Sequence, residues 1–285
     1  MTNPSSEITL KVAMLQMSSS DDVEANIAKV ESYLEDLKGA ELVVLPEMWS
    51  YLIPDHRGEE RYEHAKKYSE LIRCKLKKWA EQTKAIWVAG SILETCEKTK
   101  KVKNSCRVIS PKGQELGHYE KMHLFDNLLA DRQFSESRTV AAGEELSVLN
   151  FESFIMGLGI CYDLRFAYHF QALSEMGANM VVLPSAFSYK TGEAHWEVLL
   201  RARAIENQSY VLACNQSGSS VEGVHCWGHS MIIDPWGKVV AELEHKEGLL
   251  WAELNFDFVR EVREKMPVLS HRLFTLEDRL YDPNS

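Results

Sequence analysis

The sequence predicts an α/β fold made of two similar halves, in each of which helices cover a sheet. Short apolar runs typical of strands alternate with longer segments whose apolar residues recur at helical spacing. An internal similarity indicates the two halves. Residues 42–47 (LVVLPE) resemble residues 180–185 (MVVLPS), and residues 105–116 (SCRVISPKGQEL) resemble residues 230–241 (SMIIDPWGKVVA). Because both matches follow the same order along the chain, duplication is favoured over chance.

In the first half, strands are expected at residues 8–16, 41–45, 85–93, 104–110 and 115–119, and helices at residues 21–37 and 59–83. Leu71, Leu76 and Trp79 are expected on the buried face of the second helix. Residues 121–143 show no clear periodicity. Since long irregular segments in compact domains are often functional, this segment is a candidate source of site residues.

In the second half, strands are expected at residues 145–150, 154–160, 179–183, 209–215, 229–234, 238–243 and 249–254, and helices at residues 165–176, 193–207 and 257–265. Residues 217–227 are rich in Gly and Ser and are expected to form a loop. No Pro/Gly-rich linker divides the chain, so residues 1–285 are expected to form one domain. Residues 266–285 have little regular pattern but keep apolar side chains, which predicts a C-terminal arm that docks on a partner subunit.

Composition argues against several classes of protein. The net charge of −10 gives no support for nucleic-acid binding, and the basic residues 98–103 are expected at a solvated hairpin tip. No apolar run is long enough for a membrane span, and residues 1–12 lack the pattern of a signal peptide. The six cysteines include no C-x-x-C pair, which favours a cytoplasmic protein in a reducing environment.

The sequence gives no reason to expect a metal or another cofactor. His225, Cys226 and His229 have ligand-forming side chains, but no second ligand cluster stands out. Gly157 and Gly159 lack the third glycine and the acidic partner of a dinucleotide-binding motif. These two glycines are expected to permit close packing beside the next cysteine.

Cys161 is the central candidate for chemistry. It ends an apolar run just before a predicted helix, where a tight turn exposes a sulfur and the following N–H groups favour a thiolate. On this stretch alone, a buried core cysteine is an equally good interpretation. Glu47 also ends an apolar strand, and strand carboxyl ends in α/β sheets tend to line one crevice, although a salt-bridged structural glutamate would fit as well. Taken alone, Lys121 and Glu136 give little indication of a functional role.

Three ordered blocks resemble those of the nitrilase superfamily of carbon–nitrogen hydrolases: residues 45–47 (LPE), 119–126 (YEKMHLFD) and 159–166 (GICYDLRF). The branch of omega-amidases and deaminated glutathione amidases is similar at residues 195–196 (HW), 201–208 (RARAIENQ), 228–230 (GHS) and 234–237 (DPWG). The resemblance extends from about residue 12 to residue 281. It implies a four-layer α-β-β-α sandwich that assembles, through helices and the C-terminal arm, into a homodimer or a higher homo-oligomer.

The resemblance also implies a catalytic triad of Glu47, Lys121 and Cys161, and Glu136 best matches a second glutamate of the family. One departure is visible. The family usually continues the cysteine block with Arg-Phe-Pro-Glu, whereas this chain has RFAY at residues 165–168. Without that glutamate, Arg165 is left either to meet a substrate carboxylate or to find another partner.

The chemistry expected of these residues is amide hydrolysis. In this hypothesis Glu47 accepts the thiol proton, Cys161 attacks the carbonyl, and Lys121 with the N–H of Tyr162 stabilises the oxyanion. The expected substrate is a small carboxylate-bearing amide, such as a 2-oxo acid omega-amide, converted to a carboxylate and ammonia through a thioester.

Other functions stay open from the sequence. Deaminated glutathione, N-carbamoyl compounds and nitriles are alternative substrates for the same triad. A catalytically silent scaffold with this fold is an alternative of another class. A redox thiol protein would need a resolving cysteine, and the sequence offers none near Cys161.

Overall fold

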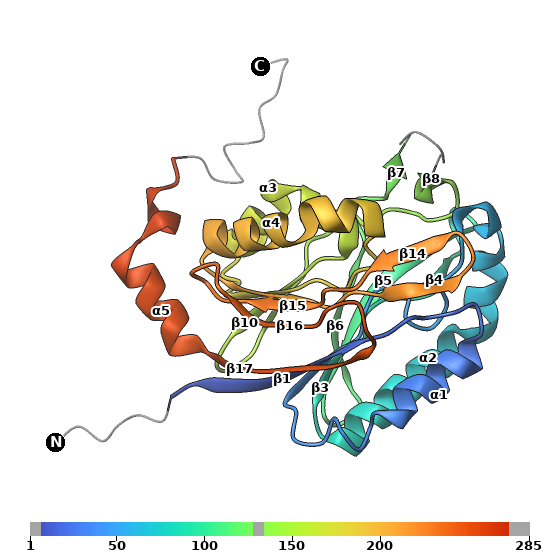
Figure 1. The fold of residues 1–285 in the computed structure, drawn as a ribbon, viewed down its shortest axis with the longest axis horizontal. Helices are drawn as coiled ribbons and strands as arrows, with labels where there is room; N and C mark the ends of the chain where they lie inside the picture. The colour runs from blue at the N-terminus through green and yellow to red at the C-terminus, as the bar shows by residue number, and fades with distance from the viewer. Residues whose placement is uncertain (1–6, 128–133, 274–285) are drawn as a thin grey trace, which may run out of the picture.

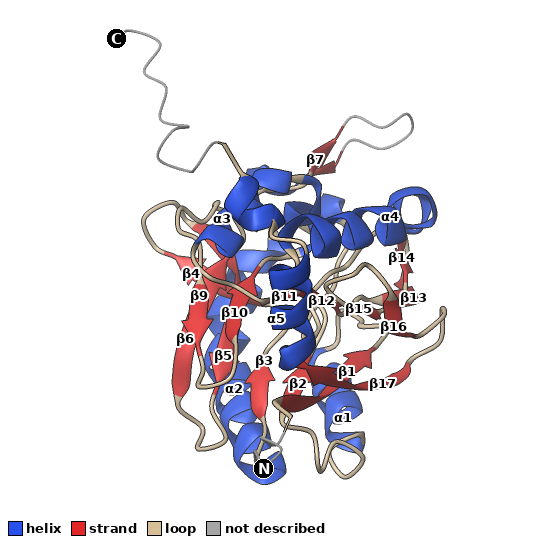
Figure 2. Cartoon of the chain, turned by 90° about the vertical axis from the view of Figure 1, so that its left-hand side faces the viewer, coloured by secondary structure: helices blue, strands red, loops and turns tan. Residues whose placement is uncertain are grey.

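The chain is a four-layer α-β-β-α sandwich. A computed structural model describes residues 7–127 and 134–273. Two β-sheets pack face to face, with α1 and α2 on one outer side and α3 and α4 on the other (Figure 1). Figure 2 shows the same arrangement after a quarter turn, with the strands between the two helical layers. The predicted fold class is confirmed.

The first sheet has the strand order β17-β1-β2-β3-β5-β4, with β6 paired to β5. Its strands are β1 (Thr9–Gln16), β2 (Leu42–Val44), β3 (Ile86–Val88), β4 (Ile92–Cys96), β5 (Lys101–Ile109), β6 (Glu115–Glu120) and β17 (Gly248–Asn255). The second sheet has the order β16-β15-β12-β11-β10-β9. Its strands are β9 (Val148–Asn150), β10 (Ile155–Leu158), β11 (Met180–Val182), β12 (Tyr210–Ala213), β15 (Met231–Ile233) and β16 (Val239–Glu242).

The remaining elements are helices and two short hairpins. The α-helices are α1 (Val23–Ser32), α2 (Glu60–Thr83), α3 (Ala167–Glu175), α4 (Tyr189–Asn207) and α5 (Phe256–Lys265). The 3₁₀ turns are η1 (Asp55–Arg57), η2 (Glu136–Arg138), η3 (Cys161–Arg165) and η4 (Val268–His271). The hairpins pair β7 (Asp126–Asn127) with β8 (Phe134–Ser135), and β13 (Ser217–Val221) with β14 (Val224–Trp227).

The two halves share the arrangement of their central strands. Strands β1, β2 and β3 pair in parallel, as do β10, β11 and β12. Antiparallel β17 flanks the first set and antiparallel β9 flanks the second, while β5–β6 and β15–β16 add matching antiparallel pairs. The sequence similarities fall on these equivalent places, first on β2 and β11 and then across the β5–β6 and β15–β16 turns. This correspondence confirms the prediction of two similar halves.

Three apolar cores separate the four layers. Trp79 of α2 belongs to the core under the first helical layer, and Phe170 and Leu200 belong to the core under the second. Val44 and Leu158 belong to the core that contains residues of both sheets. Full burial of such side chains stabilises the fold by about 1.5–3 kcal/mol each. The central strands read as continuous apolar runs because both of their faces are covered.

Several local predictions need correction. The helix expected at residues 165–176 is split into η3 and α3 by Phe166, whose backbone is extended (φ −105°, ψ 92°). The loop expected at residues 217–227 is instead the β13–β14 hairpin. Leu71 is 42% exposed, and Ile72 occupies the buried face of α2 in its place. Of the arm expected at residues 266–285, the structure describes only residues 266–273, which include η4, so its docking stays a prediction.

The fold brings three strand ends to one region. Strands β2, β6 and β10 end at Val44, Glu120 and Leu158, and Glu47, Lys121 and Cys161 follow them closely. In residues 7–127 and 134–273, no helix combines the length and apolar character that crossing a bilayer requires.

Candidate active site

Cys161 lies at a sharp turn where β10 gives way to η3. Its backbone adopts φ +46°, a left-handed conformation that is uncommon for a residue with a side chain. The turn is held by the Cys161 N–H, which donates to the Pro184 carbonyl at 2.9 Å, and by the Ile160 N–H, which donates to Asp163 at 2.8 Å. These bonds fix the sulfur at the edge of a cavity, where Cys161 stays partly exposed.

Glu47 is a buried carboxylate, 3% exposed, with defined hydrogen bonds to both oxygens. Oε1 accepts from Lys121 Nζ and from Asn104 Nδ2, each at 2.9 Å. Oε2 accepts the Ala186 backbone N–H at 2.9 Å. Glu47 also lies close enough to the Cys161 thiol for its charge to act on that thiol. A carboxylate held next to a thiol is placed to act as its base.

Lys121 is 3% exposed and lies between two carboxylates. Its Nζ is 2.9 Å from Glu47 Oε1 and 2.9 and 3.1 Å from the two oxygens of Glu136. Burial alone would lower the pKa of Lys121, but the charges of Glu136 and Glu47 outweigh burial and hold this pKa well above its usual range. Lys121 is therefore a fixed ammonium rather than a proton carrier.

The surroundings of the Cys161 thiol favour its neutral form, whereas those of Lys121 favour the charged form. Burial and then the Glu47 charge raise the thiol pKa well above the ordinary value, while Lys121 and the Ala186 N–H oppose the rise without cancelling it. The resting side chain is therefore a thiol, and Glu47 is needed to remove its proton.

Glu136 reaches Lys121 from the irregular segment because three contacts hold its side chain and the residues on either side of it. Its Oε2 accepts the Phe125 N–H at 2.7 Å. On either side, the Ser135 N–H donates to Asp55 at 3.1 Å, and Arg61 Nη1 donates to Thr139 Oγ1 at 2.7 Å. Asp55 and Arg61 come from η1 and the start of α2, so the first half of the chain clamps the segment that carries Glu136.

A cavity of about 910 Å³ opens over these groups, and Cys161, Lys121 and Glu136 all line it. Its size lies in the range typical of small-molecule sites. Arg165 also lines the cavity, where its guanidinium lies 5.1 Å from the centre of the Phe187 ring and its Nη1 lies 3.3 Å from His195 Nδ1. Within residues 7–127 and 134–273, no carboxylate lies within ion-pair distance of Arg165.

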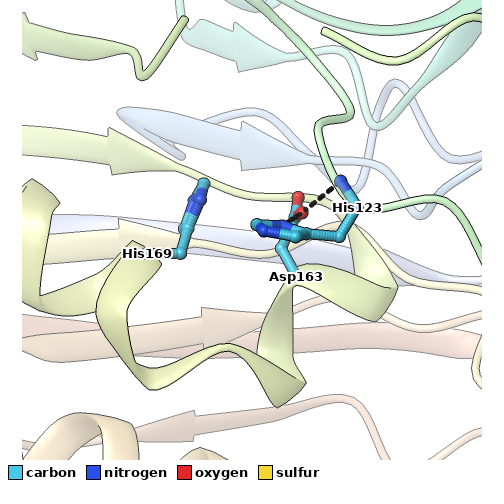
Figure 3. Close-up of side chains that lie close together, drawn as sticks. All are labelled: His123, Asp163 and His169. Carbon is cyan, nitrogen blue, oxygen red and sulfur yellow. Dashed lines mark hydrogen bonds and ion pairs between the residues drawn. The ribbon is translucent and has the colours of Figure 1, made fainter. Parts of the chain in front are cut away.

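Behind the turn, Asp163 is completely buried and hydrogen-bonds His123 (Figure 3), and it also accepts the N–H of Ile160, the residue before the nucleophile. Oδ1 accepts the His123 backbone N–H at 3.1 Å and lies 2.6 Å from His123 Nδ1. Oδ2 accepts from Tyr119 and from the Ile160 N–H, each at 2.8 Å. Burial alone would raise the pKa of Asp163, but the His123 hydrogen bond and the other donors outweigh it and hold this pKa below its usual value.

His123, Asp163 and His169 lie close enough together to suggest a metal centre. Their bonds indicate a structural role instead, because protein donors already occupy both Asp163 oxygens and His169 Nε2 lies 3.1 Å from the Leu158 carbonyl. Tyr168, which departs from the family motif, belongs to this group, since its hydroxyl hydrogen-bonds His123 Nε2. Figure 3 shows His169 beside the pair without a bond to it.

The structure thus brings together the residues proposed from the sequence. Glu47, Lys121, Cys161 and Glu136 form one connected group, and Tyr162 and Arg165 line the same cavity. Sequence reasoning missed Asn104, Asp55 and Arg61. None of the three gave a local signal, since Asn104 lies in a strand of mixed polar and apolar residues.

Comparison with known proteins agrees with this geometry. The family model for carbon–nitrogen hydrolase matches residues 11–264. The deaminated glutathione amidase of Synechocystis sp. is 40% identical over 268 residues, covering 92% of this chain and 97% of that protein. The omega-amidase NIT2 of Homo sapiens is 32% identical, covering 93% and 95%. The crystal structure of Saccharomyces cerevisiae Nit3, a member of branch 10 of the nitrilase superfamily, superposes with a TM-score of 0.81 at 31% identity, covering 93% of this chain and 97% of that one.

The chain belongs to the carbon–nitrogen hydrolase family. It is an amidase of that family, a hydrolase that acts on carbon–nitrogen bonds.

Proposed function

We propose that the protein is a thiol amidase in which Cys161 is the nucleophile, Glu47 the general base and acid, and Lys121 the cation that stabilises the oxyanion. The observation that carries this proposal is the convergence of three strand ends, with Lys121 Nζ 2.9 Å from Glu47 Oε1 and the Cys161 thiol on the wall of the same cavity as that glutamate. The raised pKa of Cys161 supports a thiol that loses its proton as it attacks.

The acylation step follows from this placement. Glu47 takes the thiol proton while Sγ bonds to the amide carbonyl carbon, and the carbonyl electron pair moves onto oxygen. Lys121 and the N–H of Tyr162 stabilise that oxyanion, and Glu136 keeps Lys121 in position. Glu47 then gives the proton to the amide nitrogen, the C–N bond breaks, and ammonia or an amine leaves.

Hydrolysis of the thioester reuses the same groups. Glu47 removes a proton from water, and the oxygen attacks the thioester carbonyl. The C–S bond breaks, the carboxylate product leaves, and Cys161 regains a proton from Glu47. The active site returns to its starting state, with one amide and one water converted to an acid and an amine.

The proposed substrate is a small amide that carries a carboxylate, such as a 2-oxo acid omega-amide. Arg165 supports this substrate class because its guanidinium faces the cavity beside aromatic rings, without a protein carboxylate among the described residues. An arginine in such a place suits bidentate binding of a substrate carboxylate.

A second candidate is deaminated glutathione. The 910 Å³ cavity supports it, since there is room for a larger leaving group than ammonia, and so does the 40% identity to an amidase of that name. The same triad would release an amine in place of ammonia.

A substrate panel tests the proposal. Purified protein is given 2-oxo acid omega-amides, deaminated glutathione, N-carbamoyl compounds and nitriles, and both ammonia and primary amine are measured. Preference for carboxylate-bearing amides, with KM raised in Arg165→Met, is the expected result. Absence of hydrolysis across the panel would contradict the proposal and favour a catalytically silent scaffold.

We also propose a cytoplasmic homodimer or higher homo-oligomer built from single-domain subunits. Two exposed apolar side chains support assembly: Val198 of α4 at 69% exposure and Trp236, on the β15–β16 turn, at 59%. Light scattering during size-exclusion chromatography measures the assembly, and a monomer across the micromolar range would contradict it.

A further inference from the structure

One buried amide contacts the catalytic carboxylate from the middle of a strand. Asn104 lies on β5 and is 1% exposed, and its Nδ2 donates to Glu47 Oε1 at 2.9 Å. The Asn104 carbonyl accepts the Lys121 N–H at 2.9 Å, and Asn104 pairs with Leu93 of the neighbouring strand β4. Asn104 therefore links Glu47 to the backbone of the residue that carries the ammonium, and its own backbone is held on both sides.

The contact with Glu47 determines which way this amide points. In the reverse orientation, Asn104 Oδ1 would face Glu47 Oε1, and two acceptors that face each other repel. In the observed orientation, Oδ1 is buried and accepts no hydrogen bond from residues 7–127 and 134–273. A buried acceptor without a donor costs free energy, so the orientation of Asn104 serves the donor that it gives to Glu47.

The donors to Glu47 are divided unequally between its two oxygens. Oε1 accepts from both Lys121 and Asn104, whereas Oε2 accepts the Ala186 N–H at 2.9 Å. The Ala186 N–H also lowers the pKa of the Cys161 thiol, so Oε2 and the sulfur lie beside the same N–H. Oε2 is therefore the oxygen on the side of the thiol, and it keeps a lone pair for the thiol proton.

A glutamate does not fix the plane of its own carboxylate, because the last torsion of the side chain is broad. Lys121 alone would hold that plane loosely, since its Nζ is shared with both oxygens of Glu136. Asn104 has a short side chain on a paired strand and donates to Oε1 of Glu47. The two donors on Oε1 and the one on Oε2 together fix the carboxylate beside Cys161.

We propose that Asn104 is a positioning residue for amide hydrolysis, which keeps Glu47 ionised and holds one of its oxygens toward the Cys161 thiol. The proposal rests on the proposed role of Glu47 as general base. Asn104 lies behind Glu47, outside the lining of the cavity, so it acts through the carboxylate and not on the substrate. A hydrogen bond to the ionised form of a carboxyl group favours that form. Without the amide, Glu47 should be less well placed and should gain a proton at a higher pH.

Asn104→Leu tests the proposal, because leucine has nearly the shape of asparagine but no donor. Alkylation of Cys161 by iodoacetamide, followed by mass spectrometry of its peptide from pH 4 to 8, needs no substrate. The rate falls toward acid pH as Glu47 is protonated, and the half-maximal pH should be higher in Asn104→Leu by about one unit. With the preferred amide, kcat at the optimum pH should fall about tenfold, since the base is misplaced.

Other ionisable groups near Glu47 do not confuse this comparison. They come from five different elements or turns and are Lys121, Glu136, Cys161, Arg61 and Cys226. Among these five, only Glu136 is a carboxyl group that can gain a proton in the acid range. Its oxygens accept from Lys121 and from the Phe125 N–H, neither of which Asn104→Leu removes. Its titration therefore contributes equally to both proteins.

Ser105→Ala is the matched control. Ser105 is the next residue on β5, is fully buried, and its hydroxyl bonds no described residue, so this variant should keep both the half-maximal pH and kcat. Asn104→Val, whose branched side chain suits a strand, should give the same shift as Asn104→Leu and serves as the second test variant. Circular dichroism establishes that each variant is folded.

Two results would contradict the proposal, and they are distinguishable. A folded Asn104→Leu or Asn104→Val protein with the half-maximal pH of the starting protein would overturn the role of Asn104 and leave Glu47 as the base. If Glu47→Gln instead alkylates Cys161 as fast as the starting protein at every pH, Glu47 is not the base, and the role of Asn104 is overturned with it.

Discussion

Cys161 and Cys226 line the same cavity, yet their surroundings differ. Cys226 lies on β14, is 3% exposed and packs in an apolar core, where burial and then the Glu47 charge raise its pKa to about 12. Cys161 follows β10 at a left-handed turn, close to the Glu47 carboxylate and the Lys121 ammonium. Both thiols have raised pKa values, so acidity alone does not distinguish them.

The difference lies in the partners. Glu47 gives Cys161 a base that can remove its proton, and Lys121 supplies a cation where negative charge develops. In its apolar core, Cys226 belongs to the buried, inert class of cysteine. A thiol in a cavity thus becomes a nucleophile through positioned neighbours, which are what the following variants remove.

Among the variants that keep the Cys161 thiol, the largest loss is expected from Glu47→Gln. The amide keeps the shape of the side chain but cannot accept the thiol proton, so kcat should fall by about 10²–10⁴. Steady-state kinetics on the preferred amide measure the loss, with circular dichroism to establish folding. Near-normal turnover in a folded Glu47→Gln variant would show that Cys161 has another base.

The second-largest loss of kcat is expected from Lys121→Met. Loss of the oxyanion cation should lower kcat by about 10²–10³, since the N–H of Tyr162 remains. The variant also leaves two buried carboxylates without their cation, so denaturant unfolding must show that it is folded. A folded Lys121→Met variant with the kcat of the starting protein would contradict the role of Lys121 in stabilising the oxyanion.

Cys226→Ala should change the pH dependence of stability and spare catalysis. Between the unfolded thiol pKa of about 8.5 and the folded value of about 12, only the unfolded state loses this proton. The free energy of unfolding therefore falls with rising pH, by up to about 1.4 kcal/mol per pH unit for this thiol. Urea unfolding measured from pH 8 to 10 should show that the free energy of unfolding falls less steeply with pH in Cys226→Ala than in the starting protein. Cys74→Ser, at an exposed site, should keep the pH dependence of the starting protein. An unchanged slope in Cys226→Ala would refute the assignment.

The smallest effect is expected from Tyr168→Phe. The change removes the hydroxyl that bonds His123, behind Asp163 and the Cys161 turn. Since Tyr168 is 49% exposed, the free energy of unfolding should fall by no more than about 0.5–1 kcal/mol, with kcat unchanged. A large loss of kcat would show that this hydroxyl, which replaces the usual family glutamate, supports the nucleophile directly.

The sequence predicted the parts of the site that depend on strand ends. Glu47 and Cys161 each follow a short apolar run, and the parallel pairing of β2 and β10 with their neighbours brings those ends to one side. The shared order of the two internal similarities likewise predicted equivalent halves. These features are visible locally because both faces of such strands are buried.

Other features depend on contacts between distant segments. Asp55 and Arg61 hold the segment of Glu136 from the opposite part of the chain, and the Ala186 N–H reaches Glu47 across 139 residues. Cys161 likewise has its N–H held by the Pro184 carbonyl, which comes from the next strand connection. Periodicity contains no information on such long-range hydrogen bonds.

The most direct test of the account is turnover of Cys161→Ala measured beside its unfolding midpoint. Removal of one sulfur at the cavity edge leaves the Asp163 network and the three cores in place, so the midpoint should stay close to that of the starting protein. We expect no detectable release of ammonia or amine from the preferred amide. Hydrolysis by the folded Cys161→Ala protein would contradict the claim that this thiol is the nucleophile.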